Sequence, residues 1–141
     1  MKERILERFL VAQDGVFETA LEEISNGRKE THWMWFVFPQ LEGLGHSHMA
    51  QYYGIQNKQE AIDYINHPVL GKRLVKISKA LLKLHSSNPK MVMGYPDDLK
   101  LCSCMTLFAE IAPNEKVFQK VLDKFFDGEK DENTIELLKN M

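Results

Sequence analysis

The stretch Thr31-His32-Trp33-Met34-Trp35-Phe36-Val37-Phe38-Pro39 decides how this chain folds. From Trp33 to Phe38 every side chain is apolar, and no other uninterrupted apolar run in the chain is as long. Aromatic side chains bury large areas, so this run is expected at the centre of the core. Because it has no period of its own and ends at Pro39, its pattern fits either a buried strand or a short buried helix.

The segment before this stretch has the three- and four-residue spacing of an amphipathic helix. Its apolar face is made by Leu6, Phe9, Leu10, Gln13, Phe17, Ala20, Leu21 and Ile24. Asp14-Gly15 interrupts the pattern at a cost in helix stability, which favours two helices that meet at a bend. Asn26-Gly27 supplies a stop.

The segment after the stretch has the pattern of a series of helices with recognisable start and stop signals. Ser47 is placed to cap a short helix, and Asn57-Lys58-Gln59-Glu60 has the pattern of a capping box. Pro68 is placed to open the next helix at its first position. Asp97-Asp98 lie where acids favour a helix N-terminus. Apolar faces then follow within residues 70–84, 101–111, 117–125 and 135–138.

No linker, repeat or low-complexity segment divides the 141 residues. The sequence therefore predicts an all-α fold, a single compact domain over residues 1–141 with six to seven helices around the buried aromatic segment. One or two very short strands near Met34–Phe38 are the alternative. Cys102 and Cys104 point about 200° apart on a helix, so we interpret them as small core residues.

The charge balance limits the partners of the protein. Eighteen Lys and Arg against twenty Asp and Glu give a net charge of −2, which excludes a broad phosphate-binding face and so argues against nucleic acid. No apolar run approaches the ~20 residues of a membrane helix. With no signal-type N-terminus and two cysteines, we expect a soluble, cytoplasmic protein without a membrane partner.

The stretch from Arg28 to Gly54 concentrates groups that bind ligands, including both Trp of the chain and three of its five His. His32 is a candidate acid or base, with a core-edge histidine as the alternative. Trp33 and Trp35 are candidate stacking walls, although core packing is the favoured interpretation of the apolar residues in this stretch. The candidate polar contacts in this stretch are Arg28, Lys29 and Gln40.

Two later helices add candidate contacts for an anion. Lys100 and Ser103 lie on one polar stripe of the helix that follows Asp97-Asp98, and Arg73 lies in the opening turns of another. Gly45-His46-Ser47-His48 offers two imidazoles without a third ligand at a diagnostic spacing. We therefore expect no metal and no cofactor.

Several phrases of the sequence resemble an uncharacterised bacterial family, domain of unknown function 1810, sometimes labelled calpastatin-like. The phrases are Gly27-Arg28-Lys29, His32 to Gln40, Gly43-Leu44-Gly45, Tyr53-Gly54-Ile55, His67 to Gly71 with Arg73, Asp97 to Leu101 with Ser103 and Met105 to Phe108, and Asp127-Gly128 with Asp131 and Thr134. The resemblance implies a mostly helical fold and no established activity. Cys102 and Cys104 depart from it, because the family usually has Arg and Ser at these positions.

Two hypotheses follow for the function. The first is a small-molecule site for an anionic, ring-containing metabolite, such as a nucleotide or an ADP-ribose-like compound, with catalysis by His32 left open. It requires His32, Gln40, Arg73 and Lys100 to line a common cleft. The alternative is a non-catalytic helical adaptor that binds a protein partner through exposed apolar surface.

Overall fold

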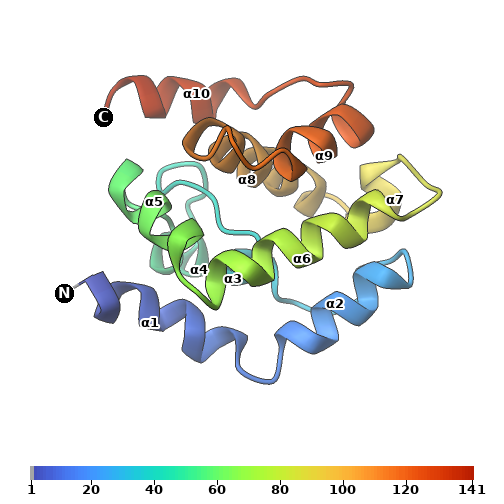
Figure 1. Cartoon of the computed structure of the whole chain (residues 1–141), viewed down its shortest axis with the longest axis horizontal. Helices are drawn as coiled ribbons and strands as arrows, with labels where there is room; N and C mark the ends of the chain where they lie inside the picture. The colour runs from blue at the N-terminus through green and yellow to red at the C-terminus, as the bar shows by residue number, and fades with distance from the viewer. Residues whose placement is uncertain (1) are drawn as a thin grey trace.

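A computed structural model describes residues 2–141 of the chain, with side chains from Leu6 onward, and this part is built from ten helices (Figure 1). They are α1 (Lys2–Gln13), α2 (Phe17–Ser25), α3 (Met34–Val37), α4 (His48–Tyr52), α5 (Lys58–Asn66), α6 (Leu70–Leu82), α7 (Pro89–Met93), α8 (Asp97–Ile111), α9 (Val117–Phe126) and α10 (Glu132–Lys139). The predicted all-α class is confirmed. No helix in the described part is long and apolar enough to cross a membrane.

The expected number of six to seven helices was too low, because three of the ten are very short. Helices α3, α4 and α7 have four or five residues each, too few to show a 3.6-residue period, and of these only α4 was expected as a helix, from its cap at Ser47. The aromatic stretch forms α3, so the alternative of strands at Met34–Phe38 is wrong. Within residues 2–141 the one β-type pairing is an isolated parallel bridge between Leu41 and Ile55.

Most of the predicted helix ends are confirmed. Helix α1 ends at Gln13, and α2 begins at Phe17 after Gly15, whose φ is +71°. The Ser47 side chain accepts a hydrogen bond from the Ala50 amide, and the Asn57 side chain accepts one from the Glu60 amide. These contacts are the expected N-caps of α4 and α5.

Helix α6 begins differently from the expectation, since its first residue is Leu70 and not Pro68. The side chain of His67 takes the capping role. Its Nδ1 accepts hydrogen bonds from the amides of Val69 and Leu70 at 3.1 and 3.2 Å. A nitrogen that accepts a hydrogen bond carries no proton, so these contacts place the ring proton of His67 on Nε2.

In Figure 1, α6 crosses the middle of the molecule, with α1 and α2 below it and α9 and α10 above it. Helix α6 packs against α2, α5 and α9, and α8 packs against α5, α7, α9 and α10. The core between them contains the fully buried rings of Trp33, Phe38 and Phe108. The aromatic stretch is therefore at the centre of the helices, as its composition predicts.

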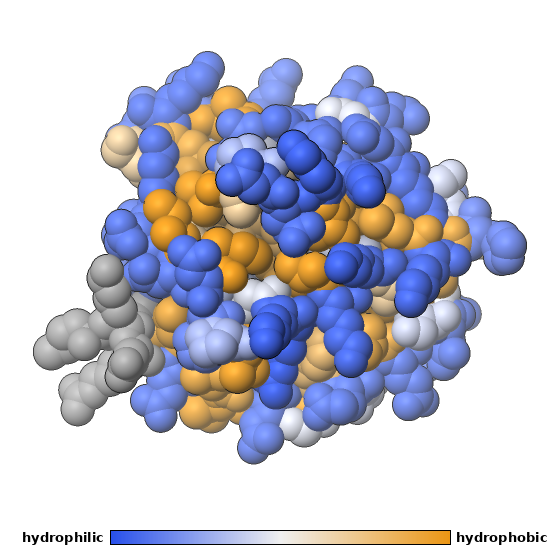
Figure 2. All heavy atoms as spheres, viewed as in Figure 1, coloured by the Kyte–Doolittle hydropathy of each residue, from blue (hydrophilic) through white to orange (hydrophobic). Residues whose placement is uncertain are grey.

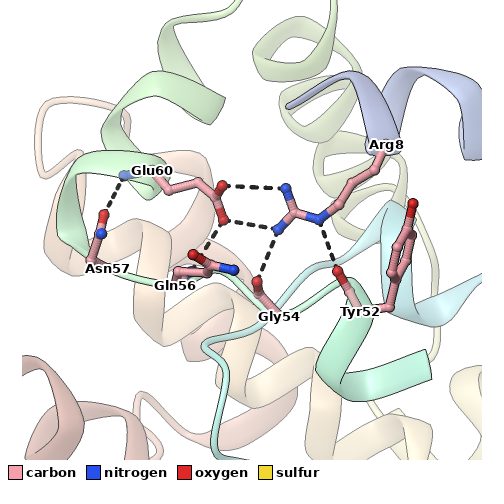
Figure 3. A network of polar contacts seen from close by, with 6 residues as sticks. All are labelled: Arg8, Tyr52, Gly54, Gln56, Asn57 and Glu60. Carbon is pink, nitrogen blue, oxygen red and sulfur yellow. Dashed lines mark hydrogen bonds and ion pairs between the residues drawn. The ribbon is translucent and has the colours of Figure 1, made fainter. Parts of the chain in front are cut away.

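A buried ion pair fastens α1 to α5 and to the end of α4 (Figure 3). Arg8 donates to both carboxylate oxygens of Glu60, at 2.9 and 3.2 Å, and to the carbonyl oxygens of Tyr52 and Gly54, each at 2.9 Å. The Glu60 carboxylate also accepts from the Gln56 amide at 3.1 Å. The capping-box pattern predicts that Glu60 reaches back to the Asn57 amide, and the bond goes one residue further.

Candidate functional site

Several of the predicted ligand contacts come together at one cleft beside α8. Its volume is about 790 Å³, and it lies between the loop after α3, the outer side of α8 and the connection from α9 to α10. Gln40, Lys100 and Ser103 line it. A narrow recess holds Trp35 together with Gln40 and Lys100. We call this cleft with its recess the α8 cleft.

Lys100 lines both the cleft and its narrow recess. Its ammonium group lies 5.4 Å from the centre of the Trp35 ring and 3.6 Å from Oδ1 of Asp97. Lys100 and Asp97 thus form an ion pair that is too long for a hydrogen bond, so the N–H groups of Lys100 can still donate to an anion. Ser103 donates its hydroxyl proton to the Leu99 carbonyl at 3.2 Å, which leaves its oxygen as an acceptor.

The far wall of the α8 cleft is acidic. Four carboxylates line it against the two ammonium groups of Lys100 and Lys130; they belong to Asp127, Glu129, Asp131 and Glu132. Lys130 already forms an ion pair with Glu110 across to α8. Apolar contacts come from Leu44, Leu99 and Phe126. A ligand that fits here must therefore offer hydrogen-bond donors to the carboxylates as well as an anionic group to Lys100.

Five predicted site residues lie away from the α8 cleft, and three of them are Arg28, His32 and Arg73. Arg28 and His32 are exposed on the loop between α2 and α3, and neither lines the cleft or its recess. Arg73, on α6, donates to the side-chain oxygen of Gln13 at 3.2 Å and lies over the Phe17 ring. The first hypothesis requires one cleft lined by His32, Gln40, Arg73 and Lys100. The α8 cleft contains only Gln40 and Lys100 of this set. We therefore assign no catalytic role to His32.

Trp33 is not a stacking wall, because none of its side chain is exposed. Its indole Nε1 donates to Oε1 of Glu23 at 2.9 Å, and its ring packs against Phe38. Lys29 also has a structural position. Its ammonium group contacts the Asp97 carboxylate at 2.8 Å and the Thr31 carbonyl at 2.6 Å, with 6% of the side chain exposed. Both residues support the loop, and neither lines the α8 cleft.

The buried carboxylate of Glu23 organises this loop. It accepts hydrogen bonds from the Thr31 hydroxyl, from the amides of Glu30 and Thr31, and from Trp33. Burial alone would raise the pKa of Glu23, but these four donors outweigh it and lower the pKa from 4.5 to about 2. Glu23 is therefore a charged anchor that needs no cation beside it.

A second concave surface was missed by the sequence interpretation. A groove of about 880 Å³ lies between the end of α5, the outer face of α6 and residues 111–115. We call it the α5–α6 groove. Lys72, Lys76 and Lys79 line it at i, i+4 and i+7 of α6, so they share one side of the helix. That spacing was visible in the sequence.

The possible metal ligands and the two thiols are the remaining reactive groups of the described residues. Among the described residues no group of three or more His, Cys, Asp or Glu side chains could hold a metal ion. Cys104 is fully buried in the core, as expected, and Cys102 is half-buried at the α8 cleft. Burial raises the pKa of both thiols, that of Cys102 to about 11 with the nearby Asp131 carboxylate adding to the effect.

The family model described as "Protein of unknown function (DUF1810)" matches residues 3–138. The chain belongs to the DUF1810 family. A similar solved structure, that of the conserved hypothetical protein Rv1873 from Mycobacterium tuberculosis, is 44% identical in sequence. The likeness covers 95% of this chain and 96% of that chain, with a TM-score of 0.93. A comparison with curated proteins found no match. Membership of DUF1810 thus confirms the resemblance and assigns no activity.

Proposed function

We propose that the protein binds a small anionic metabolite that also carries hydroxyl or amino groups, and that the α8 cleft is the binding site. A nucleotide or an ADP-ribose-like compound has this chemistry. Its phosphate would contact the ammonium group of Lys100, and its sugar hydroxyls would donate to carboxylates such as Glu129 and Glu132. We propose binding without a reaction, because the candidate acid or base His32 lies outside the cleft.

The observation that supports this proposal is the convergence of side chains from separate segments. Gln40 comes from the loop after α3, Lys100 from α8 and the carboxylates from the connection before α10. The cleft is of the size usual for small-molecule sites, about 300–1,000 Å³. Four carboxylates against two ammonium groups disfavour a simple anion such as inorganic phosphate. They favour a ligand that brings its own donors.

Ligand binding is tested by thermal unfolding of the protein with ADP-ribose, ADP, a sugar phosphate and inorganic pyrophosphate. A ligand at one hundred times its dissociation constant adds about 2.7 kcal/mol to the free energy of unfolding. We expect ADP-ribose or ADP to raise the melting temperature, and pyrophosphate to have a smaller effect at equal concentration.

Two variants locate the site, and a third controls for charge. Lys100→Ala and Gln40→Ala should abolish the rise in melting temperature, whereas Lys139→Ala, which removes an exposed ammonium group from α10, should preserve it. Circular dichroism checks that each variant is folded. The proposal is wrong if none of these compounds stabilises the protein, or if Lys100→Ala keeps the full effect.

A further inference from the structure

The α5–α6 groove combines a row of cations with an aliphatic floor. Lys72, Lys76 and Lys79 are exposed, and none of their ammonium groups forms a hydrogen bond or ion pair with residues 6–141. The row extends for about 10 Å along the helix axis at 1.5 Å per residue. One acidic side chain, Glu115, lines the groove. Its Oε1 accepts from the Val117 amide at 3.3 Å.

The floor of the groove is apolar and partly exposed to solvent. Ile62 and Ile65 come from α5, Val75 from α6, and Ile111 from the end of α8. Ile62 has 36% of its surface exposed, and the other three are half-buried. Figure 2 shows this face of the molecule, where orange apolar atoms gather in the middle between blue polar atoms. Leaving such a surface in water costs free energy, and a partner would recover it.

The backbone holds the two helices that form the groove close together. At Gly71 a Cβ atom would lie 2.0 Å from the Ile65 carbonyl oxygen. A side chain at this position would therefore push α6 away from α5. His67 caps the start of α6 and lines the same groove, where its Nε2–H adds a donor to the positive end of the helix.

We infer that the α5–α6 groove binds an acidic amphipathic helix of a partner protein. Glutamates spaced at i, i+4 and i+7 repeat at the same interval as the lysine row, so each carboxylate meets one ammonium group. Leucine or isoleucine side chains on the adjacent face would pack against Ile62, Val75 and Ile111. This surface is separate from the α8 cleft, and the inference does not depend on the ligand proposed there.

The lining of the groove favours a helix over other anionic partners. No Trp, Tyr or Phe lines it, so the bases of a nucleic acid would find no ring on which to stack. The net charge of −2 also opposes a long polyanion.

The probe for this inference is a fluorescein-labelled synthetic peptide of about 20 residues, long enough for an isolated helix to form. It carries Leu on one face, Glu at i, i+4 and i+7 beside that face, and Ala elsewhere. A second peptide has Lys in place of each Glu. We expect fluorescence anisotropy to show binding of the Glu peptide that weakens as salt is added, and no binding of the Lys peptide.

Charge reversal identifies the surface that binds. The variant Lys72→Glu/Lys76→Glu should weaken binding of the Glu peptide at least tenfold. The control Lys58→Glu/Lys139→Glu makes the same change in net charge at exposed positions outside the groove, and should stay within twofold of the unchanged protein. Ile62→Ser tests the apolar floor and should weaken binding severalfold without a change in charge. Circular dichroism and thermal unfolding verify that every variant is folded.

Each other outcome overturns the inference. Equal loss in the groove and control variants would mean binding by net charge alone. No binding of the Glu peptide, with all proteins folded, would exclude this occupant. If sedimentation shows a dimer of the unchanged protein that Lys72→Glu/Lys76→Glu dissociates, the groove is an interface between two copies of the chain. If ADP displaces the peptide and Lys100→Ala leaves this displacement intact, the groove is a site for small anions.

Discussion

The indole nitrogen of Trp33 donates a hydrogen bond to Oε1 of Glu23 at 2.9 Å. This bond connects the last turn of α2 to the aromatic stretch, and the same carboxylate holds Glu30 and Thr31 in between. A charged group 7% exposed is costly unless donors surround it. The donors around Glu23 supply this compensation, and they also attach the loop that carries Arg28 and His32 to the core.

The first prediction concerns the stability of Glu23→Gln. An amide has one acceptor oxygen, and its NH₂ group would face the donors that the second carboxylate oxygen now serves. We expect a loss of about 1–3 kcal/mol in the free energy of unfolding, the range for a buried polar group left unpaired. Urea denaturation measures it. The exposed neighbour Glu22→Gln should change stability by less than about 0.5 kcal/mol.

The second prediction is a loss of stability in acid that depends on Glu23. The pKa of this carboxyl is about 2 in the folded protein and 4.5 ordinarily, so the folded state binds the proton less tightly than the unfolded state. The contribution of the Glu23 carboxylate to the free energy of unfolding is complete above pH 4.5, and it disappears as the pH falls toward 2. Urea midpoints measured across this range should fall steeply for the unchanged protein and less steeply for Glu23→Gln. Parallel curves would contradict this assignment.

The third prediction concerns the ion pair of Arg8 with Glu60 in Figure 3. The side chains are 10% and 8% exposed, and Arg8 also serves two carbonyl oxygens. Arg8→Ala leaves a buried carboxylate without its cation and should cost about 3–5 kcal/mol. Arg8→Lys keeps the charge and loses the planar two-pronged geometry, so it should restore part of that loss. If Lys restores all of it, geometry contributes nothing.

The fourth prediction concerns the close approach of α5 and α6 at Gly71. In Gly71→Ala the new methyl group would overlap the Ile65 carbonyl, with a calculated separation of 2.0 Å. The helices must separate, and we expect a loss of about 1–3 kcal/mol, the usual range for overpacking. Lys79→Ala on the exposed face of α6 is the control and should be nearly neutral. Unchanged stability of Gly71→Ala would show that the helices adjust freely.

The fifth prediction concerns thiol reactivity. Burial, together with the nearby Asp131 carboxylate, raises the pKa of Cys102 to about 11, and burial raises that of Cys104. Thiolate is the reactive form, so Ellman's reagent should react slowly with the folded protein at neutral pH and rapidly with both thiols in denaturant. Fast reaction of one thiol in the folded protein, lost in Cys102→Ser, would contradict the assignment for Cys102.

Periodicity predicted the helices that are long enough to display it, including the bend between α1 and α2 and the long α8. It failed at α3, because a run of six apolar residues from Trp33 to Phe38 has no contrast between faces. The same lack of contrast hid the difference between the two tryptophans. One helical turn directs Trp33 into the core and leaves Trp35 half-buried at the α8 cleft.

The candidate site was predictable only in part, because contacts between distant segments depend on packing. Gln40 and Lys100 are sixty residues apart, and nothing in either local pattern shows that they share a cleft that excludes His32. The lysine row of α6 was readable from its spacing. The groove beside it was not, because its other wall is the end of α8, which no pattern in α6 reveals.

The parallel bridge between Leu41 and Ile55 joins the two ends of the loop that lies between these residues. Its bonds run from the Glu42 amide to the Ile55 carbonyl and from the Ile55 amide to the Gln40 carbonyl, each at 2.9 Å. These two bonds hold the ends of the loop together and so reduce the number of conformations that it can adopt. Because the loop also forms a wall of the α8 cleft, the ligand that we propose for this cleft would lose little binding free energy to the ordering of that wall.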